Sequence, residues 1–333
     1  MFSAPNRRDF LHALLGSATG LSVWSASASS MAFGQEPHPP GRRSPQSRGT
    51  AAGTGQAPLA ATRLGENLTL ITGAGGNVVV VNGPDGLAMV NGGQFARSAA
   101  LLKMVGEQAP GKRVTTLFNT DWHADHCGSN EALGKAGAAI IAHENTKQYQ
   151  ANDQFVDWQN RTYKALPAQA LPNRTFYTSD KMTFGRERIE FAQLGQAHTD
   201  GDIYVFFPDS NVLVAGDVVT IGTYPIADYT SGGWLGGLMN ATKALVELSN
   251  ADTRVVPGVG PLQTRADLQA QLEMLTAARD RMPKLMRQGK GREEILASGV
   301  TKEFDERWGD PKVFLSTSLR GLMIHVRELG GIV

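Results

Sequence analysis

Residues 119–130 constrain this chain more than any other stretch, and they read Asn-Thr-Asp-Trp-His-Ala-Asp-His-Cys-Gly-Ser-Asn. Two imidazoles and two carboxylates fall within the six positions 121–126. The apolar, β-branched run 114–118 precedes them, and a helix-like segment opening at Ser129 or Asn130 follows. Side chains crowded on a strand-to-helix loop can converge on one point, and imidazole with carboxylate suits zinc or a similar divalent ion. Alone, the stretch would also fit a polar loop whose aspartates cap a turn.

Composition narrows the class of protein. The chain has 333 residues, of which 41% are hydrophobic and 19% charged, which is ordinary for a globular protein with one large or two modest domains. A net charge of +1 gives no bulk field for nucleic acid or an anionic surface, so neither is expected as a partner. No internal run is long enough for a membrane span. The single cysteine, Cys127, excludes an intrachain disulfide and any Cys-rich zinc site.

The first 34 residues have the order of regions typical of an export signal. Arg7-Arg8 is followed by a mild apolar run, 11–23, and then by small residues that offer a cleavage site after Ala28 or Ala32. The paired arginines resemble the twin-arginine type of signal. They predict a periplasmic or secreted bacterial protein with no membrane segment after the signal is removed. Residues 35–58, rich in Pro, Gly, Ser and Gln, are expected to form a disordered linker.

The remaining residues, 59–333, are expected to form one layered α/β domain. Short apolar and β-branched runs separated by glycine-rich turns predict a meander of strands, after which strands and helices alternate. The predicted strands are 67–72, 77–82, 87–91, 114–118, 138–142, 203–208 and 212–215, and the predicted helices are 99–105, 131–136, 264–282, 292–297 and 313–329. The C-terminal helices thus occupy about 264–329.

The segment between residues 146 and 175 has aromatic residues and prolines but little periodicity. It predicts a long excursion over the surface. Ordinary surface packing is favoured slightly over a wall beside a substrate site. His143 and His325 are expected to be structural, and Cys127 to be a small, buried and inert residue.

Four separated motifs occur in an order that resembles the metallo-β-lactamase superfamily. They are His-x-Asp-His at 123–126, Gly-x-x-His-Thr-x-Gly-Asp at 195–202, a strand ending in Gly216-Asp217, and Pro-Gly-Val-Gly-Pro at 257–261. The resemblance covers about residues 65–280. It implies a four-layer αββα sandwich with metals at one edge, where these loops meet.

The resemblance also implies roles for individual residues. His123 and His198 match ligands of a first metal, Asp125 and His126 match ligands of a second, and Asp217 matches the carboxylate that bridges both. The expected cofactor is one or two Zn²⁺ ions, with iron as an alternative.

Two positions depart from the family pattern. Asp121 stands where the motif begins with histidine, and it can ligate through oxygen instead. Val259 stands where the last histidine is usual, and valine cannot bind a metal. We therefore expect one tightly held metal and a second that is weak or absent.

The function implied is that of an exported metallo-hydrolase acting on a small ester, lactone, lactam or thioester through a metal-bound hydroxide. Asp125 would orient the attacking water and take its proton. Two alternatives stay open: an iron-dependent oxidoreductase of the same fold, and a non-catalytic binding protein whose altered site is a relic.

Overall fold

The computed structural model describes residues 57–328. The expected export signal, nearly all of the expected linker and the last residue of the expected final helix lie outside the described residues. Among the described helices, none combines the length and the apolar character that crossing a bilayer requires.

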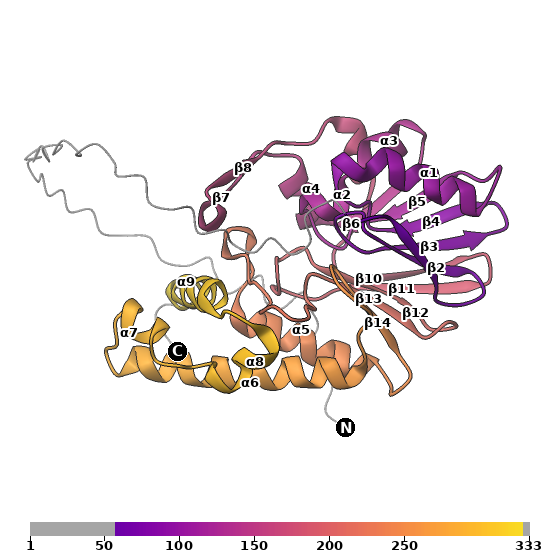
Figure 1. The fold of residues 1–333 in the computed structure, drawn as a ribbon. Helices are drawn as coiled ribbons and strands as arrows, with labels where there is room; N and C mark the ends of the chain where they lie inside the picture. Colours follow the sequence, from indigo (N-terminus) through magenta and orange to yellow (C-terminus); the bar gives the residue numbers. More distant parts are fainter. Residues whose placement is uncertain (1–56, 329–333) are drawn as a thin grey trace, which may run out of the picture. The chain divides into compact units, whose positions relative to one another are not determined.

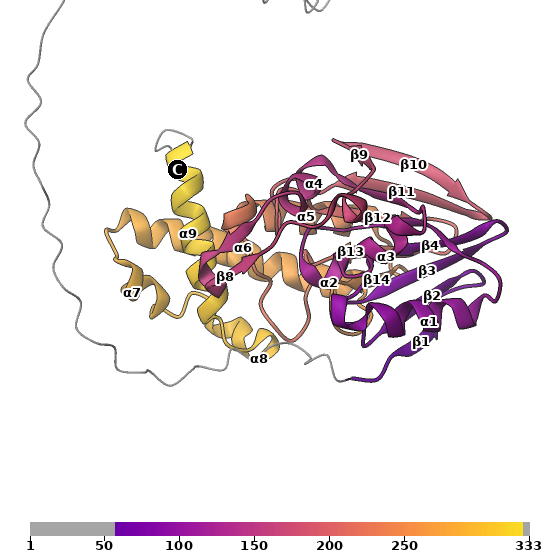
Figure 2. The ribbon, with the colours of Figure 1, turned by 90° about the horizontal axis from the view of Figure 1, so that it is seen from above.

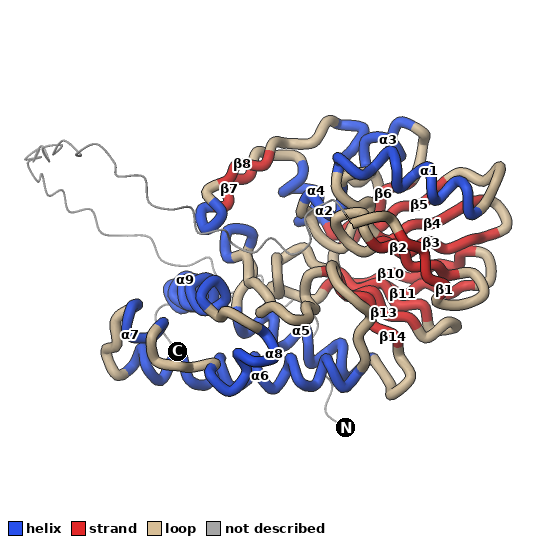
Figure 3. The backbone as a smooth tube through the Cα atoms, viewed as in Figure 1, coloured by secondary structure: helices blue, strands red, loops and turns tan. Residues whose placement is uncertain are grey.

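Two β-sheets packed face to face form the centre of the molecule (Figure 3). The first has the order β1-β2-β3-β4-β5-β6-β9; β1 to β4 form antiparallel hairpins, and β4, β5, β6 and β9 run parallel. Its strands are β1 (Ala60–Arg63), β2 (Leu68–Thr72), β3 (Val78–Gly83), β4 (Gly86–Val90), β5 (Val114–Phe118), β6 (Ala139–His143) and β9 (Arg174–Phe176).

The second sheet has the order β10-β11-β12-β13-β14, antiparallel except for the parallel pair β13 and β14. A separate hairpin, β7 with β8, stands apart from both sheets. These strands are β7 (Gln154–Val156), β8 (Arg161–Tyr163), β10 (Ser179–Phe184), β11 (Glu187–Gln193), β12 (Ile203–Phe207), β13 (Val212–Gly216) and β14 (Arg254–Pro257).

Helices complete the outer layers (Figure 1). α1 (Ser98–Gln108) and α3 (Asn130–Lys135) cover the first sheet, and α5 (Leu235–Leu248) and α6 (Arg265–Arg287) cover the second. The helices α7 (Arg292–Leu296), α8 (Asp305–Trp308) and α9 (Lys312–Glu328) gather at one end, beyond the sheets (Figure 2). The four-layer αββα sandwich expected from the sequence is thereby confirmed.

The alternation of side chains along single strands explains the layering. In β3, Val79 and Val81 enter the core between the sheets, whereas Val78 and Val80 enter the core under α1. β13 divides in the same way, with Val212 and Val214 on the inner face. Each of these strands is buried on both faces, so its sequence is almost continuously apolar.

Several local predictions need correction. The segment 146–175 is not irregular throughout, because α4 (Glu144–Gln150) opens it and β9 joins the first sheet. Ser129 stands at the N-cap position of α3, but its hydroxyl donates to the Gly92 carbonyl oxygen at 2.6 Å rather than capping the helix. β10, β11 and α5 were not predicted. The predicted helix 264–282 is confirmed as α6, and Thr264 with Asp267 forms a capping box at its start.

We expect Phe118→Ala to lower the free energy of unfolding by about 3–5 kcal/mol, because it opens a cavity between the sheets. The Phe118 ring is fully buried and meets the Phe191 ring edge to face, with 5.0 Å between centroids. Urea unfolding followed by circular dichroism measures the change. Phe155→Ala is the control; that side chain is 57% exposed, so its loss should cost less than about 0.5 kcal/mol. Equal losses in the two variants would contradict this account of the core.

Candidate metal centre

The polar residues singled out in the sequence lie on loops at one edge of the sandwich. Asp121 and His123 follow β5, His198 lies between β11 and β12, and Asp217 follows β13. Parallel β4, β5 and β6, with β13 beside β14, end at this edge, so their following loops meet there. α2 (Ala124–Cys127) starts directly after His123 and turns the chain away.

Local hydrogen bonds shape the loops. Asp202 accepts from the Thr199 backbone N–H and from the Thr199 hydroxyl, both at 2.8 Å, and closes the turn that presents His198. The Asn77 amide donates to the carbonyl oxygens of Pro257 and Gly260 and holds the 257–261 loop against β3. Asp202 and the 257–261 loop therefore shape the site without carrying candidate ligand atoms themselves.

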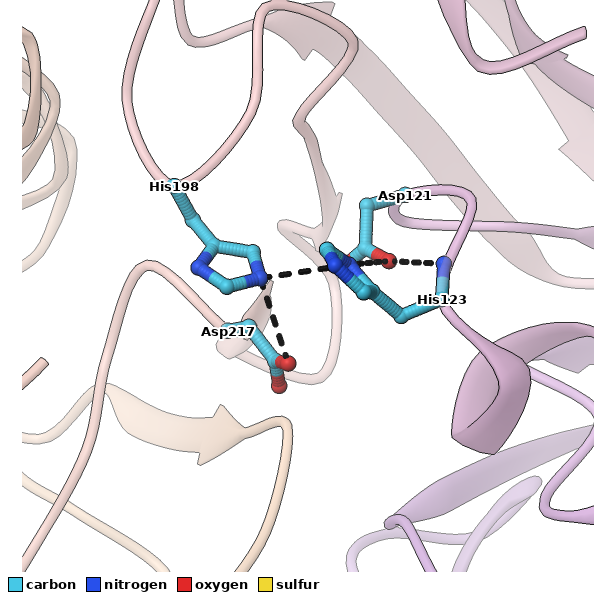
Figure 4. Close-up of side chains that lie close together, drawn as sticks. All are labelled: Asp121, His123, His198 and Asp217. Atoms are coloured by element: carbon cyan, nitrogen blue, oxygen red, sulfur yellow. Dashed lines mark hydrogen bonds and ion pairs between the residues drawn. The ribbon is translucent and has the colours of Figure 1, made fainter. Parts of the chain in front are cut away.

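Four of the predicted residues form one cluster, Asp121, His123, His198 and Asp217, whose candidate ligand atoms all lie within 4.8 Å of one another (Figure 4). His198 Nε2 lies 3.2 Å from His123 Nδ1 and 3.6 Å from Asp217 Oδ2. Asp121 Oδ1 lies 3.1 Å from His123 Nδ1 and accepts from the His123 backbone N–H at 2.7 Å. Two ring nitrogens and two carboxylates thus point at one place.

A second cluster adjoins the first through Asp217. Asp125, His126 and Asp217 bring their candidate ligand atoms within the same mutual distance. His126 Nε2 lies 3.0 Å from Asp217 Oδ1 and 3.5 Å from Asp121 Oδ2. The structure therefore brings together all six of the residues selected from the sequence.

The polar atoms of these clusters are poorly satisfied by protein alone. Within the described residues, Asp121 Oδ2 and both ring nitrogens of His126 are buried without a hydrogen-bond partner. The 3.0 Å approach of His126 to Asp217 lacks hydrogen-bond geometry. Buried polar groups are costly when they are left unpaired, and a shared cation would satisfy imidazole and carboxylate together. The residues present fit a metal.

Asp228 belongs to this site and was missed in the sequence. Its Oδ2 lies 3.4 Å from His123 Nε2, and its carboxylate accepts from the Ser231 hydroxyl at 2.8 Å and the Trp158 indole N–H at 3.1 Å. Burial opposes ionisation of Asp228, but the neighbouring His123 imidazole and the Thr230 hydroxyl hold the pKa of its carboxyl well below the usual range. A carboxylate on one ring nitrogen orients the other nitrogen toward a metal.

His198 is oriented in a comparable way, because its Nδ1 lies 2.7 Å from the Ile226 carbonyl oxygen and its Nε2 is left for the cluster. Asp228, which faces His123, and the Ile226 carbonyl oxygen, which faces His198, both belong to the segment 222–228. The aspartate followed by Thr230 and Ser231 is a local turn signal that could have drawn attention to Asp228.

Comparison with known proteins identifies the family of this chain. A sequence model of the metallo-beta-lactamase superfamily matches residues 71–273, which is more than half of the chain. The protein belongs to the metallo-β-lactamase superfamily.

Curated relatives are distant but span most of the same domain. The chain is 26% identical over 208 residues to a metallo-beta-lactamase type 2 of Bacillus cereus, covering 60% of this chain and 72% of the relative. It is 25% identical over 206 residues to the metallo-beta-lactamase type 2 of Bacillus sp. (strain 170), with the same coverage. Members of this superfamily are mostly metal-dependent hydrolases.

Solved structures share the fold. A metallo-beta-lactamase from Pontibacter korlensis superposes with a TM-score of 0.54 at 21% identity, covering 66% of this chain and 99% of that chain. The DIM-1 metallo-beta-lactamase gives a TM-score of 0.53 at 18% identity, covering 66% and 98%. These likenesses establish the architecture of this superfamily member and leave its substrate open.

The two positions at which the sequence was expected to depart from the superfamily pattern both lie at the site. Asp121 is fully inside the first cluster, with its carboxylate 1% exposed. Val259 lines a cavity of about 400 Å³ together with Asp125, His198 and Asp217. The side chain at position 259 therefore faces the second cluster and offers it no ligand atom.

The segment 146–175 is a wall of the site, which corrects the slight preference for ordinary surface packing. A cavity of about 550 Å³ is lined by residues of the clusters, of the β7–β8 hairpin and of the loop before α1. Trp158, Arg161 and Tyr163 come from the hairpin, and Phe95 comes from the loop.

The other candidates behave as expected from the sequence. His143 is bonded away from the clusters, to the Tyr177 carbonyl oxygen and the Asn145 backbone N–H. His325 stacks on Trp234, with 3.7 Å between ring centroids. Cys127 is buried, and burial raises the pKa of its thiol far above the usual range. A thiol kept protonated in this way is inert.

Metal-free protein should hold His126 as an imidazolium. Burial alone would lower its pKa, but the carboxylates of Asp121, Asp217 and Asp125 raise it to about 10. The ordinary value is about 6.5, so this group contributes stability that is fully present below about pH 6.5 and lost as pH rises through about 10. A cation and this proton compete for the same carboxylates.

We expect the free energy of unfolding of chelator-treated protein to fall as pH rises between about 6.5 and 10, and to fall less in His126→Gln. Urea unfolding at a series of pH values measures both slopes. His143→Gln is the control. Burial lowers the pKa of His143, so this residue affects the free energy of unfolding only at lower pH, and the slope between about pH 6.5 and 10 should stay as in wild type. Equal slopes in wild type and His126→Gln would refute the assignment.

Proposed function

We propose that this protein is an exported metal-dependent hydrolase that cleaves a small ester, lactone, lactam or thioester. The observation that carries the proposal is the convergence of two carboxylates and two imidazoles, with unsatisfied buried polar atoms beside them, on the floor of a cavity of about 550 Å³. Membership of the superfamily supports it. Export rests on Arg7-Arg8 and the apolar run that follows, and cell fractionation tests it.

In this proposal Asp121, His123, His198 and Asp217 hold one divalent ion. Asp125, His126 and Asp217 hold a second more weakly, because Val259 adds no ligand. Zinc is the expected metal, and two imidazoles with carboxylate would also accept iron(II). An ion bound there would polarise an acyl oxygen and lower the pKa of a nearby water molecule.

Asp125 is the catalytic base of the proposed reaction. It is half-buried and lines the cavity, and burial, with Asp217 nearby, raises the pKa of its carboxyl although His126 opposes the shift. A raised pKa brings a carboxylate closer to the range in which it accepts a proton well. Asp125 would orient the attacking water and take its proton, which then becomes available to the leaving group.

The surrounding residues hold this arrangement. Asp228 and the Ile226 carbonyl oxygen keep the two imidazoles in their ligating orientation. Trp158 and Tyr163 cover one side of the cavity and reduce the access of bulk water. Asp121 adds a negative charge to the ligand set where the superfamily usually has a neutral imidazole, so we expect a less acidic water and an activity shifted to higher pH.

An iron-dependent oxidoreductase is the second candidate, because two histidines with a carboxylate also suit iron(II). Elemental analysis and visible absorption of the natively exported protein separate it from a zinc hydrolase. The third possibility, a binding protein with a relic site, requires no hydrolysis with any metal and a stability indifferent to chelator.

We expect protein purified without added metal to retain about one equivalent of metal and to lose ester and lactam hydrolysis on treatment with chelator. His198→Ala should lose both the metal and the activity, because it removes an imidazole from the first cluster. His143→Gln, outside the clusters, should keep both. Elemental analysis with a panel of esters and lactams measures this; two full equivalents retained through dialysis against chelator would contradict the expected weak second site.

Restoring the usual ligands should strengthen the centre. We expect Asp121→His with Val259→His to raise zinc affinity and kcat/KM by roughly tenfold or more, because the second cluster gains an imidazole and the first loses a charge. Zinc titration against a competing chelator measures the affinity. Val259→Leu in place of Val259→His is the matched control and should give no gain beyond that of Asp121→His alone. An unchanged affinity in the double variant would rule out position 259 as a ligand position.

A further inference from the structure

The β7–β8 hairpin places one cation in the wall of the cavity. Arg161 is the only arginine or lysine among the described residues that line the cavity above the clusters. The remaining charged groups of that lining are the carboxylates of Asp125 and Asp217, together with the imidazoles. Arg161 is exposed, so its guanidinium can be reached by a molecule that enters the cavity.

A stack of rings fixes Arg161 relative to the metal centre. Its guanidinium carbon lies 4.6 Å from the centroid of the Tyr163 ring. Tyr163 packs edge to face on Trp122, at 5.5 Å, and Trp122 stacks on His123, at 4.3 Å. A guanidinium held over an aromatic face loses little further freedom when it binds a ligand.

The hairpin is also tied to the centre by hydrogen bonds. The Trp158 indole N–H donates to Asp228 Oδ1 at 3.1 Å, while Asp228 Oδ2 faces His123. The Tyr229 hydroxyl donates to Asp157 on the same hairpin. Arg161 is therefore carried on a segment braced to the ligand set and not on a free surface loop.

The donors of Arg161 are left open. Within the described residues, no carboxylate oxygen lies within ion-pair distance of its guanidinium. Lys164, three residues further along, shows the contrast, because it is paired with Asp153 at 2.6 Å. The Tyr163 hydroxyl is already turned toward Gln159, at 2.6 Å. An arginine that is positioned but unpaired can bind a planar anion with two parallel hydrogen bonds.

The charge of the centre makes such a cation significant. Asp121 and Asp217 together cancel the charge of one divalent ion, and Asp125 adds a further negative charge nearby. A neutral substrate needs no counter-charge in the cavity wall, whereas an anionic substrate does. Arg161 can supply it from the hairpin that lines the cavity.

We propose that Arg161 binds a carboxylate of the substrate, so that the protein prefers acyl compounds carrying a carboxylate remote from the bond that is cleaved. This inference rests on the proposed hydrolase function. The competing explanation is that Arg161 serves only to stack on Tyr163 and stiffen the hairpin.

Matched esters test the preference. Mono-4-nitrophenyl glutarate carries a remote carboxylate, and 4-nitrophenyl valerate is a neutral analogue of similar length. We expect Arg161→Gln to lower the ratio of kcat/KM for the anionic ester to kcat/KM for the neutral one by about tenfold, because a charge-assisted bond is lost. Arg161→Lys, which keeps a point charge, should lower the ratio by only about threefold. The ratio in wild type should fall as sodium chloride is raised.

Arg113→Gln is the matched control, since Arg113 is an exposed arginine at the opposite end of β5 and should leave the ratio unchanged. An unchanged ratio in Arg161→Gln overturns the proposal. If the ratio is unchanged because kcat/KM falls equally for both esters, Arg161 serves only to stiffen the hairpin.

Binding to chelator-treated protein separates this inference from the hydrolase proposal. The probes are 3-phenylpropionate and its neutral analogue 3-phenylpropan-1-ol, followed by the fluorescence of the tryptophans near the site. We expect Arg161→Gln to weaken binding of the carboxylate about tenfold and binding of the alcohol little. If neither ester is hydrolysed with any metal, the hydrolase proposal fails, and this measurement alone decides whether Arg161 is an anion site. Equal carboxylate binding in wild type and Arg161→Gln overturns it.

Discussion

The contact between His126 and Asp217 is the constraint on which the rest of this structure depends. His126 lies in α2, after a strand of the first sheet, and Asp217 directly follows a strand of the second, yet their polar atoms lie 3.0 Å apart, with His126 fully buried and Asp217 partly buried. Burying several charges together is unfavourable unless they are paired or bound to a metal. The apolar core between the sheets supplies the stability that makes this gathering possible, because it brings the two strand ends to the same edge.

The backbone near the centre is adapted to this crowding. A Cβ atom at Gly258 would lie 1.8 Å from Asp217 Oδ1, and one at Gly233 would lie 2.1 Å from the His198 carbonyl oxygen. Glycine is therefore required at both positions for the loops to approach the ligating side chains. Some residues at the site thus carry candidate ligand atoms, whereas the glycines leave the space that the ligating loops occupy.

Local pattern was enough to predict much of the fold and the polar cluster at 121–126, whereas His198 and Asp217 were selected only through the resemblance to the superfamily. β5 is apolar and directly followed by Asp121 and His123, so both the strand and its polar end were visible in one short stretch. β10 is exposed along most of its length, and its weak apolar signal explains why it was missed. Asp228 was missed, and the hairpin wall was slightly disfavoured, for another reason: their roles arise from tertiary contact with His123 and Trp122, which no local pattern reports.

The two altered positions and the hairpin act on the same quantity, the electrostatic potential in the cavity. In the proposed centre, Asp121 in place of an imidazole would make the ligand set more negative, and Val259 would leave the second cluster short of a ligand for a further cation. Both changes weaken the attraction of the centre for an anionic group. A protein with this centre must either accept uncharged substrates or place a cation elsewhere in the cavity. Arg161, held over Tyr163 on a braced hairpin, is placed where such a cation would be needed.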